Sequence, residues 1–197
     1  LVGRDLVKRY LEKDKFVITY VGAHGVANHL IQLVEAAEKL RDTQIVFQLI
    51  GSGMQKKMLQ EEVKKKNLDN VIFRDPVPKS EVFKFILASD MGASVLKNVD
   101  TFKTIYSNKT FDYMSCKKPI LLAIDGVSKE LINNSESGIF VQPENAEDIA
   151  EKINVNYKKD ILLEQMGSNG YKYAKAHFDR QVLAMRYVNY LKDVFLK

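Results

Sequence analysis

The sequence holds one cysteine, Cys116, and no tryptophan among its 197 residues. A single cysteine excludes a disulfide within the chain and a metal site built from several thiolates. This usage is consistent with a reducing, cytoplasmic compartment. Cys116 has no histidine near it in sequence, so we expect it to serve in packing rather than as a nucleophile.

Long hydrophobic runs are also missing, since none approaches the roughly 20 residues that a membrane-spanning helix requires. The opening residues Leu1-Val2-Gly3-Arg4-Asp5 do not resemble a signal peptide. These features predict a soluble protein. The chain does not begin with methionine and starts on a short amphipathic stretch, so we expect it to be a segment of a longer protein.

Two nucleotide-binding fingerprints are absent. Gly51-Ser52-Gly53 is followed by Lys56 where a dinucleotide fingerprint has its third glycine, and Gly22-Ala23-His24-Gly25 lacks the required spacing. No glycine run ends in Gly-Lys-Ser or Gly-Lys-Thr. A redox dinucleotide is therefore disfavoured, and phosphate-loop hydrolases are excluded.

The charge balance allows an anionic partner, because the formal net charge is +5 and the isoelectric point is about 9.1. One predicted helix carries the obvious basic cluster of Lys56, Lys57, Lys64, Lys65 and Lys66. Glutamates are interspersed and aromatic residues are lacking, so we interpret the cluster as a solvated face and expect no nucleic-acid partner. Asp90, Asp100 and Asp125 are scattered, and we expect no metal site.

Seven strand-like apolar runs alternate with helix-like stretches, and hydrophobic residues make up 46% of the chain. Bounds can be given for six of these strands, which are predicted at 16–21, 44–50, 71–73, 91–96, 119–124 and 139–141. Parallel strands need long crossovers, so this alternation predicts an α/β fold with a doubly wound parallel sheet. From Asn145 onward three helices are predicted, at 146–155, 160–176 and 180–195. The last has a wide apolar stripe, which we expect to pack partly on the sheet and partly against a partner or a missing domain.

The segment from Ser107 to Met114 is the strongest candidate for a ligand site. Lys109, Asp112 and Tyr113 are three and four residues apart, so they are predicted to share one helix face. Ser107 or Asn108 is expected to cap the first turn through a side-chain oxygen. A helix start favours an anion such as phosphate, to which Lys109 adds a positive charge, and Asp112 can accept hydrogen bonds from two sugar hydroxyls. The alternative is an exposed Lys–Asp pair contributing roughly 0 to 1 kcal/mol.

Position within the fold supports a nucleotide, because ligands of open α/β sheets bind beyond the carboxyl ends of the strands. Both glycine turns and the Lys109 helix are predicted at that edge. His24 faces the same edge in this interpretation and could donate to a phosphate, although a lone histidine in a turn is also commonly structural.

Several motifs together resemble the carboxyl-terminal domain of retaining glycosyltransferases of family 4, which have the two-domain GT-B fold. The resemblance covers residues 16–178 and rests most on 107–114, followed by Lys118-Pro119-Ile120. It is carried further by 20–25, 49–53, 71–73 with 76–78, and 138–141. The chain is most similar to the subset that attaches amino sugars in capsule or lipopolysaccharide assembly.

The resemblance implies roles for individual residues. Asp112 corresponds to the second glutamate of the family's paired-glutamate motif, which holds the ribose, and Lys109 is placed to meet the diphosphate. Two departures stand out: Thr104 occupies the place of the first glutamate, and the usual arginine and lysine after the first strand are absent. The predicted donor-binding residues are Gly22, His24, Gly25, Gly51, Phe73, Val77, Ser107, Asn108, Lys109 and Asp112, with Lys109 and Asp112 also as the catalytic pair.

The resemblance also implies a domain plan and a reaction. Residues 1–15 would be a leader or linker, 16–178 a nucleotide-sugar-binding domain, and 179–197 a helix packing toward an absent amino-terminal domain. The reaction would move a sugar from a nucleoside diphosphate sugar, with UDP favoured, to a hydroxyl acceptor with retained configuration. No tightly bound cofactor is expected, and the fragment alone would be inactive. A lipid-linked acceptor would place the protein at the inner membrane face, where its basic surface would aid contact with anionic lipids.

Two other functions stay open. A nucleoside diphosphate sugar epimerase would share the donor site and turn over without an acceptor. A non-catalytic nucleotide-binding module would bind the donor without turnover, and Thr104 in place of glutamate is compatible with it.

Overall fold

The computed structural model describes residues 15–195. Its centre is one parallel six-stranded sheet in the order β3-β2-β1-β4-β5-β6. The strands are β1 (Phe16–Val21), β2 (Ile45–Ile50), β3 (Val71–Arg74), β4 (Met91–Val95), β5 (Ile120–Ala123) and β6 (Gly138–Phe140). The predicted doubly wound α/β sheet is confirmed. Within the described range six strands form, one fewer than the seven apolar runs.

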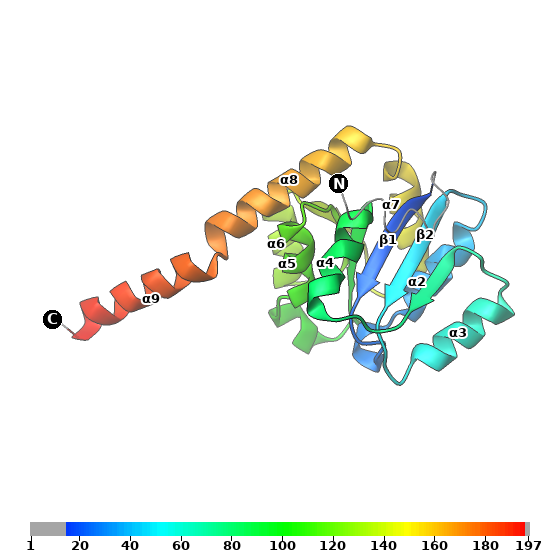
Figure 1. Ribbon diagram of the computed structural model, residues 1–197, viewed down its shortest axis with the longest axis horizontal. Coiled ribbons are helices and arrows are strands. Elements are labelled where there is room, and N and C mark those ends of the chain that lie inside the picture. Colours follow the sequence, from blue (N-terminus) through cyan, green and yellow to red (C-terminus); the bar gives the residue numbers. More distant parts are fainter. Residues whose placement is uncertain (1–14, 196–197) are drawn as a thin grey trace.

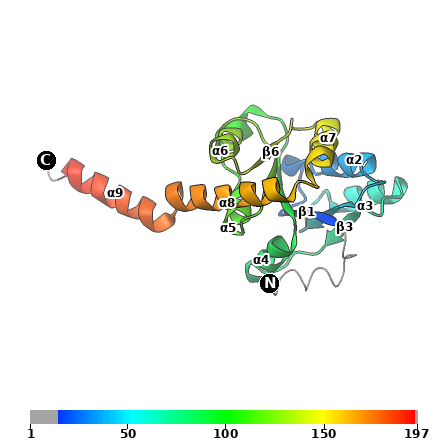
Figure 2. The ribbon, with the colours of Figure 1, turned by 90° about the horizontal axis from the view of Figure 1, so that it is seen from above.

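Helices cover both faces of the sheet (Figures 1 and 2). They are α2 (Ile31–Lys39), α3 (Lys56–Lys65), α4 (Lys79–Ala88), α5 (Asn108–Ser115), α6 (Val127–Ser135), α7 (Ala146–Asn156), α8 (Asp160–His177) and α9 (Arg180–Phe195), with short 3-10 turns η1 (Val26–Asn28) and η2 (Asp100–Thr104). Figure 2 shows α2 and α7 on one face and α4 and α5 on the other. Each face has its own buried apolar cluster. All six residues of β2 are buried, as expected of a parallel strand covered on both sides.

The strand order reverses beside β1, which pairs with β2 on one side and with β4 on the other. Loops after β1 and β4 therefore leave the sheet in opposite directions and open a crevice at its carboxyl edge. The backbone N–H of Lys97, after β4, donates to the carbonyl of Ala27, after β1, at 2.8 Å. That contact holds the two loops together at the edge where the ligand was predicted.

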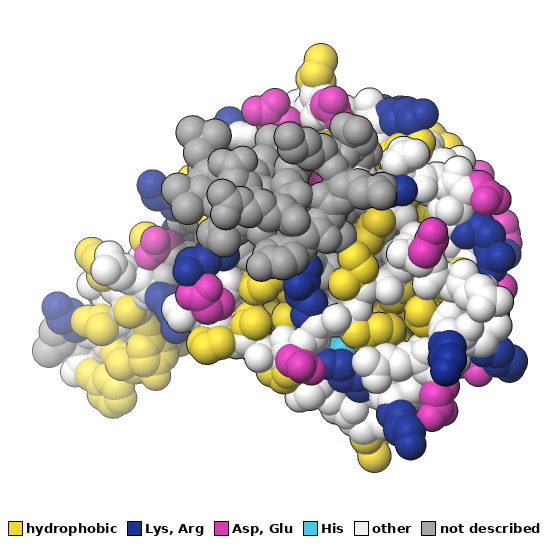
Figure 3. Space-filling view, turned by 45° about the vertical axis from the view of Figure 1, so that its right-hand side comes forward, with side chains coloured by type: hydrophobic (Ala, Val, Ile, Leu, Met, Phe, Trp, Pro, Cys, Tyr) yellow, Lys and Arg dark blue, Asp and Glu magenta, His cyan; other side chains and the backbone are white. Residues whose placement is uncertain are grey.

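The last helix projects away from the body of the fold (Figure 1). None of its residues is buried, and Met185, Tyr187 and Phe195 are 66%, 64% and 79% exposed. Hydrophobic side chains gather on this helix in the space-filling view (Figure 3). The expectation that its stripe packs partly on the sheet is wrong, because α8 carries the chain past the end of the sheet. Contact with a partner or another domain stays a prediction.

The predicted leader, residues 1–15, lies outside the described residues except for Lys15. Across 15–195, no helix combines the length and the apolar character needed to cross a bilayer.

Candidate functional site

The two glycine turns interlock at the carboxyl edge of the sheet. Gly51 follows β2 with φ +147°, and a Cβ there would lie 1.9 Å from the carbonyl oxygen of Gly22. The turn after β1 also hydrogen-bonds the second turn, since His24 N donates to Ser52 O at 2.8 Å. Only glycine at position 51 allows this approach. Gly22, Gly51 and Val77 line a cavity of about 290 Å³, so three of the predicted residues are brought together.

Lys56 holds the second glycine turn through hydrogen bonds. Its ammonium donates to the carbonyls of Gly51 (2.9 Å) and Arg74 (3.0 Å) and to Asp75 Oδ1 (2.8 Å). Its side chain is only 16% exposed. The assignment of Lys56 to a solvated basic face is therefore wrong, because three acceptors around the turn hold it inward. Helical spacing alone could not reveal these acceptors.

His24 is fully buried, with its ring centroid 6.1 Å from those of Tyr20 and Phe73. Neither ring nitrogen has a hydrogen-bond partner within residues 15–195. Burial, with a smaller contribution from Lys56, lowers the pKa of His24 to about 4, so the imidazole is neutral at pH 7. The ring is buried rather than exposed at the edge, and its contact with a phosphate stays a prediction. Phe73 lies behind the turn, partly buried against the core. Gly25 precedes η1 and accepts from Asn28 N.

The start of α5 lacks the predicted cap. Ser107 is the residue before the helix, yet its side chain makes no capping hydrogen bond, and neither does that of Asn108. The Ser107 hydroxyl instead accepts a hydrogen bond from Lys109 Nζ at 3.3 Å. Thr110 N donates to Ser107 O at 3.0 Å, whereas the backbone N–H groups of Asn108 and Lys109 have no hydrogen-bond partner among residues 15–195 and are available to an anion.

Lys109 lies between the helix start and the first glycine turn. Its ammonium sits 5.2 Å from the centroid of the Tyr20 ring, and its Cε is 3.3 Å from where a Cβ on Gly22 would be. Burial lowers its pKa to about 8, partly opposed by the charge of Asp112. No ion pair with a residue of 15–195 neutralises it. A desolvated ammonium beside the positive end of a helix favours the binding of an anion at this part of the described edge.

Tyr113 corrects the predicted arrangement of α5. It is fully buried, and its hydroxyl accepts from Val21 N at 3.2 Å and donates to Ala93 O at 3.1 Å. Its ring fills the space beside Gly92, where a Cβ would approach within 2.3 Å. Tyr113 therefore pins α5 to β1 and β4 and is not part of an exposed face with Lys109 and Asp112.

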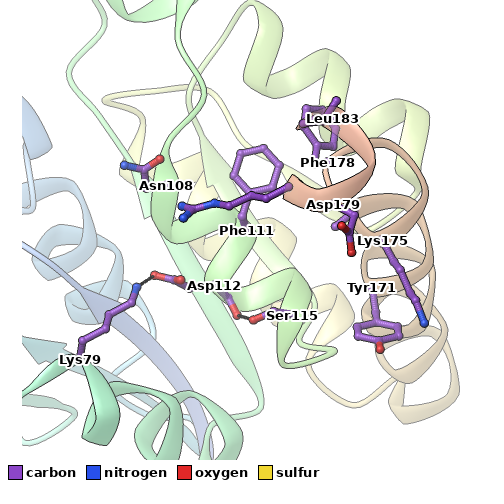
Figure 4. A pocket seen from close by; sticks show the side chains of 12 residues that line it. Lys79, Asn108, Phe111, Asp112, Ser115, Tyr171, Lys175, Phe178, Asp179 and Leu183 are labelled. Atoms are coloured by element: carbon purple, nitrogen blue, oxygen red, sulfur yellow. Dashed lines mark hydrogen bonds and ion pairs between the residues drawn. The ribbon is translucent and has the colours of Figure 1, made fainter. Parts of the chain in front are cut away.

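Asp112 faces a larger cavity of about 670 Å³ between α4, α5 and the α8–α9 junction (Figure 4). Asn108 lines the same cavity. The Asp112 carboxylate is bonded to Lys79 at 2.6 Å rather than to Lys109. The sequence analysis did not predict Lys79, Lys56 or Tyr20 as residues of the site. Of these three residues, only Lys79 could have been noticed in the sequence, because a cation in the first turn of a helix is unfavourable.

Thr104, in the place of the family's first glutamate, is exposed, and its hydroxyl donates to Thr101 O at 3.0 Å. Among residues 15–195, no three His, Cys, Asp or Glu side chains gather closely enough to hold a metal ion. The edge thus offers an unpaired cation, free backbone N–H groups and one carboxylate.

A family model for glycosyl transferases group 1 matches residues 4–173. The chain belongs to this family. An uncharacterized glycosyltransferase of Methanocaldococcus jannaschii is 25% identical over 180 residues, which are 91% of this chain and 49% of that protein. The chain spans about half the length of the curated relatives it matches.

Solved structures of glycosyl transferases share the fold. The Anabaena protein HepE, in complex with UDP and glucose, superposes with a TM-score of 0.83 at 18% identity, covering 97% of this chain and 52% of that one. The carboxyl-terminal domain of the group 1 protein LpcC from Francisella tularensis superposes with a TM-score of 0.75 at 21% identity, covering 88% of this chain and 91% of that one. The group 1 chain described here therefore has the Rossmann-like fold of a GT-B carboxyl-terminal domain.

Proposed function

We propose that this chain is the donor-binding half of a retaining glycosyltransferase that moves a sugar from a nucleoside diphosphate sugar to a hydroxyl acceptor. The observation that carries the proposal is Lys109, a desolvated ammonium with no counter-ion in residues 15–195, held beside an uncapped helix start and the Gly22 turn. A diphosphate would supply the negative charge that balances the Lys109 ammonium. UDP is the favoured nucleotide, supported by the UDP and glucose bound to the structurally similar Anabaena protein.

The pieces of the donor map onto separate parts of the edge. The diphosphate lies against Gly22, Lys109 and the first turn of α5, and this positive region stabilises the charge that develops on the departing diphosphate. The ribose hydroxyls bond Asp112. The base sits toward Val77, in the cavity that this side chain shares with both glycine turns. Backbone groups there can read the edge of a uracil.

The acceptor and much of the catalytic surroundings come from an amino-terminal domain, and the described half alone does not turn over. We place the reaction in capsule or lipopolysaccharide assembly, supported by a 21% identical relative of Escherichia coli described as a putative colanic acid biosynthesis glycosyl transferase. A lipid-linked acceptor at the inner membrane face fits the net charge of +5.

A non-catalytic donor-binding module is the second candidate, and Thr104 is the observation that favours it. Its hydroxyl is uncharged and engaged with Thr101 O, where the family has a carboxylate. Donor binding without sugar transfer in the full-length protein would identify such a module. Turnover of the donor in the absence of any acceptor would instead identify an epimerase.

Calorimetric titration with UDP, GDP and ADP tests the proposal. We expect saturable binding of one nucleotide, UDP first among them. Lys109→Ala and Asp112→Ala should each weaken it by about tenfold to a hundredfold, because a charge-assisted hydrogen bond contributes about 1.5 to 3 kcal/mol.

Matched controls come from η2, where Lys103 and Asp100 form an exposed pair at 2.8 Å near the same edge. Lys103→Ala and Asp100→Ala remove the same charges without touching the site and should leave the dissociation constant within about twofold. Absence of nucleotide binding, or equal losses in the control variants, would contradict the proposal.

A further inference from the structure

The carboxylate assigned to the ribose is already occupied. Lys79 Nζ donates to Asp112 Oδ2 at 2.6 Å, and Figure 4 shows the two side chains reaching toward each other from α4 and α5. Within residues 15–195 this is the only hydrogen bond recorded for the Asp112 carboxylate. The Asp112 side chain is 25% exposed and that of Lys79 is 65% exposed. The pair therefore lies at the mouth of the larger cavity rather than in the core.

Lys79 is placed where a lysine is electrostatically unfavourable. It is the first residue of α4, and Pro78 before it provides no side-chain cap. A cation at a helix amino terminus is opposed by the helix dipole. Glu81 in the same turn does not compensate, because both its oxygens bond Lys84, at 2.7 and 2.9 Å. Asp112 is thus the one carboxylate in the described residues that forms an ion pair with Lys79.

A ribose diol and Lys79 compete for the same oxygen. Two neighbouring hydroxyls bond a carboxylate best through both oxygens, and Oδ2 is held by the ammonium. Resting on the function proposed above, we propose that Lys79 occludes the ribose subsite and must leave Asp112 before a nucleoside diphosphate binds fully. Lys79 also sits two residues after Val77, which lines the smaller cavity. A base seated against Val77 therefore lies next to the segment that has to move.

The lock is weak, because the pair lies at the surface and the Lys79 side chain is 65% exposed. An exposed ion pair contributes about 0 to 1 kcal/mol, which corresponds to a factor of up to about five in a dissociation constant. Such a lock penalises any ligand that must use Asp112, and it has little effect on a ligand that does not.

Titration of Lys79→Met with UDP and with 2′-deoxy-UDP tests the occlusion. Lys79→Met should bind UDP about two- to fivefold more tightly than the parent chain. The gain should be smaller for 2′-deoxy-UDP, which lacks one of the two hydroxyls. In the Asp112→Ala background, Lys79→Met should give no gain, because no carboxylate remains to be released.

Lys84→Met is the matched control, since Lys84 lies on the same helix, is also ion-paired and would contribute a similar long-range charge. It should leave UDP affinity unchanged or slightly weaker. Unchanged or weaker UDP binding by Lys79→Met overturns the occlusion while leaving the proposed function intact if the parent chain binds UDP. Failure of both the parent and Lys79→Met to bind any nucleoside diphosphate overturns both.

Discussion

At the scale of single residues, Lys109 carries the electrostatics of the site. Its pKa of about 8 lies below the usual 10.5 because burial disfavours the ammonium. A bound diphosphate stabilises the ammonium and raises that pKa again. Binding therefore takes up a proton at any pH between the free and the bound pKa values, and the affinity must fall as the pH rises above the free value.

We predict that the dissociation constant for UDP is nearly flat between pH 7 and about 8 and then rises, approaching tenfold per pH unit. Calorimetry near pH 8.5 in buffers of different ionisation enthalpy should report the proton uptake directly. Lys109→Met should bind weakly and lose this pH dependence, whereas Lys103→Met should keep it. A dissociation constant that stays constant through pH 9.5 would show that the Lys109 charge does not take part.

Residue identity predicted part of this site. The chemistry proposed for Lys109 and Asp112 could be inferred from the sequence because cation, carboxylate and helix start occur within one short segment. The residues that contact them could not be inferred from the sequence. The Lys79–Asp112 pair joins α4 to α5, and the cavity beside Gly92 that receives Tyr113 belongs to β4, so both depend on packing between elements distant in sequence.

At the scale of elements, the site is built by two turns that fit into each other. Gly51 is buried with φ +147°, and its missing Cβ leaves room for the carbonyl of Gly22. Gly25, in the same first turn, has φ −104°, and the nearest atom to a Cβ there would be 3.9 Å away. Two glycines of the predicted site are thus under different constraints.

We predict that Gly51→Ala lowers the free energy of unfolding by about 1–3 kcal/mol or more, through strain at positive φ and collision with Gly22. Gly25→Ala should change it by no more than about 0.5 kcal/mol. Urea denaturation followed by circular dichroism measures both. If the two variants were equally stable, the interlocked turns would not support the edge as described.

Element borders followed the sequence where periodicity decides them. The strands and α9 were found within a residue or two, because apolar spacing reflects burial along one element. The packing of α9 was not found, since an apolar stripe does not specify what covers it. The same limit applies to Lys56, whose three acceptors come from the end of β3 and from the turns after β2 and β3, not from its own helix.

At the scale of the whole molecule, we propose that the chain is one half of a two-domain architecture. It spans about half the length of its curated relatives, and it matches the carboxyl-terminal domain of LpcC over 91% of that domain. The exposed apolar side chains of α9 are explained if the helix contacts an amino-terminal domain, as we propose. The edge proposed to bind the donor lies within residues 15–195, so the proposed donor binding can be tested on this chain alone.

The most direct test of the central claim is an NMR titration of the ¹⁵N-labelled chain with UDP. We expect the largest amide shifts at Gly22, Gly51, Lys109 and Asp112, with α9 nearly unaffected. Shifts confined to other parts of the chain, or none at millimolar UDP, would contradict a donor site between the glycine turns and α5.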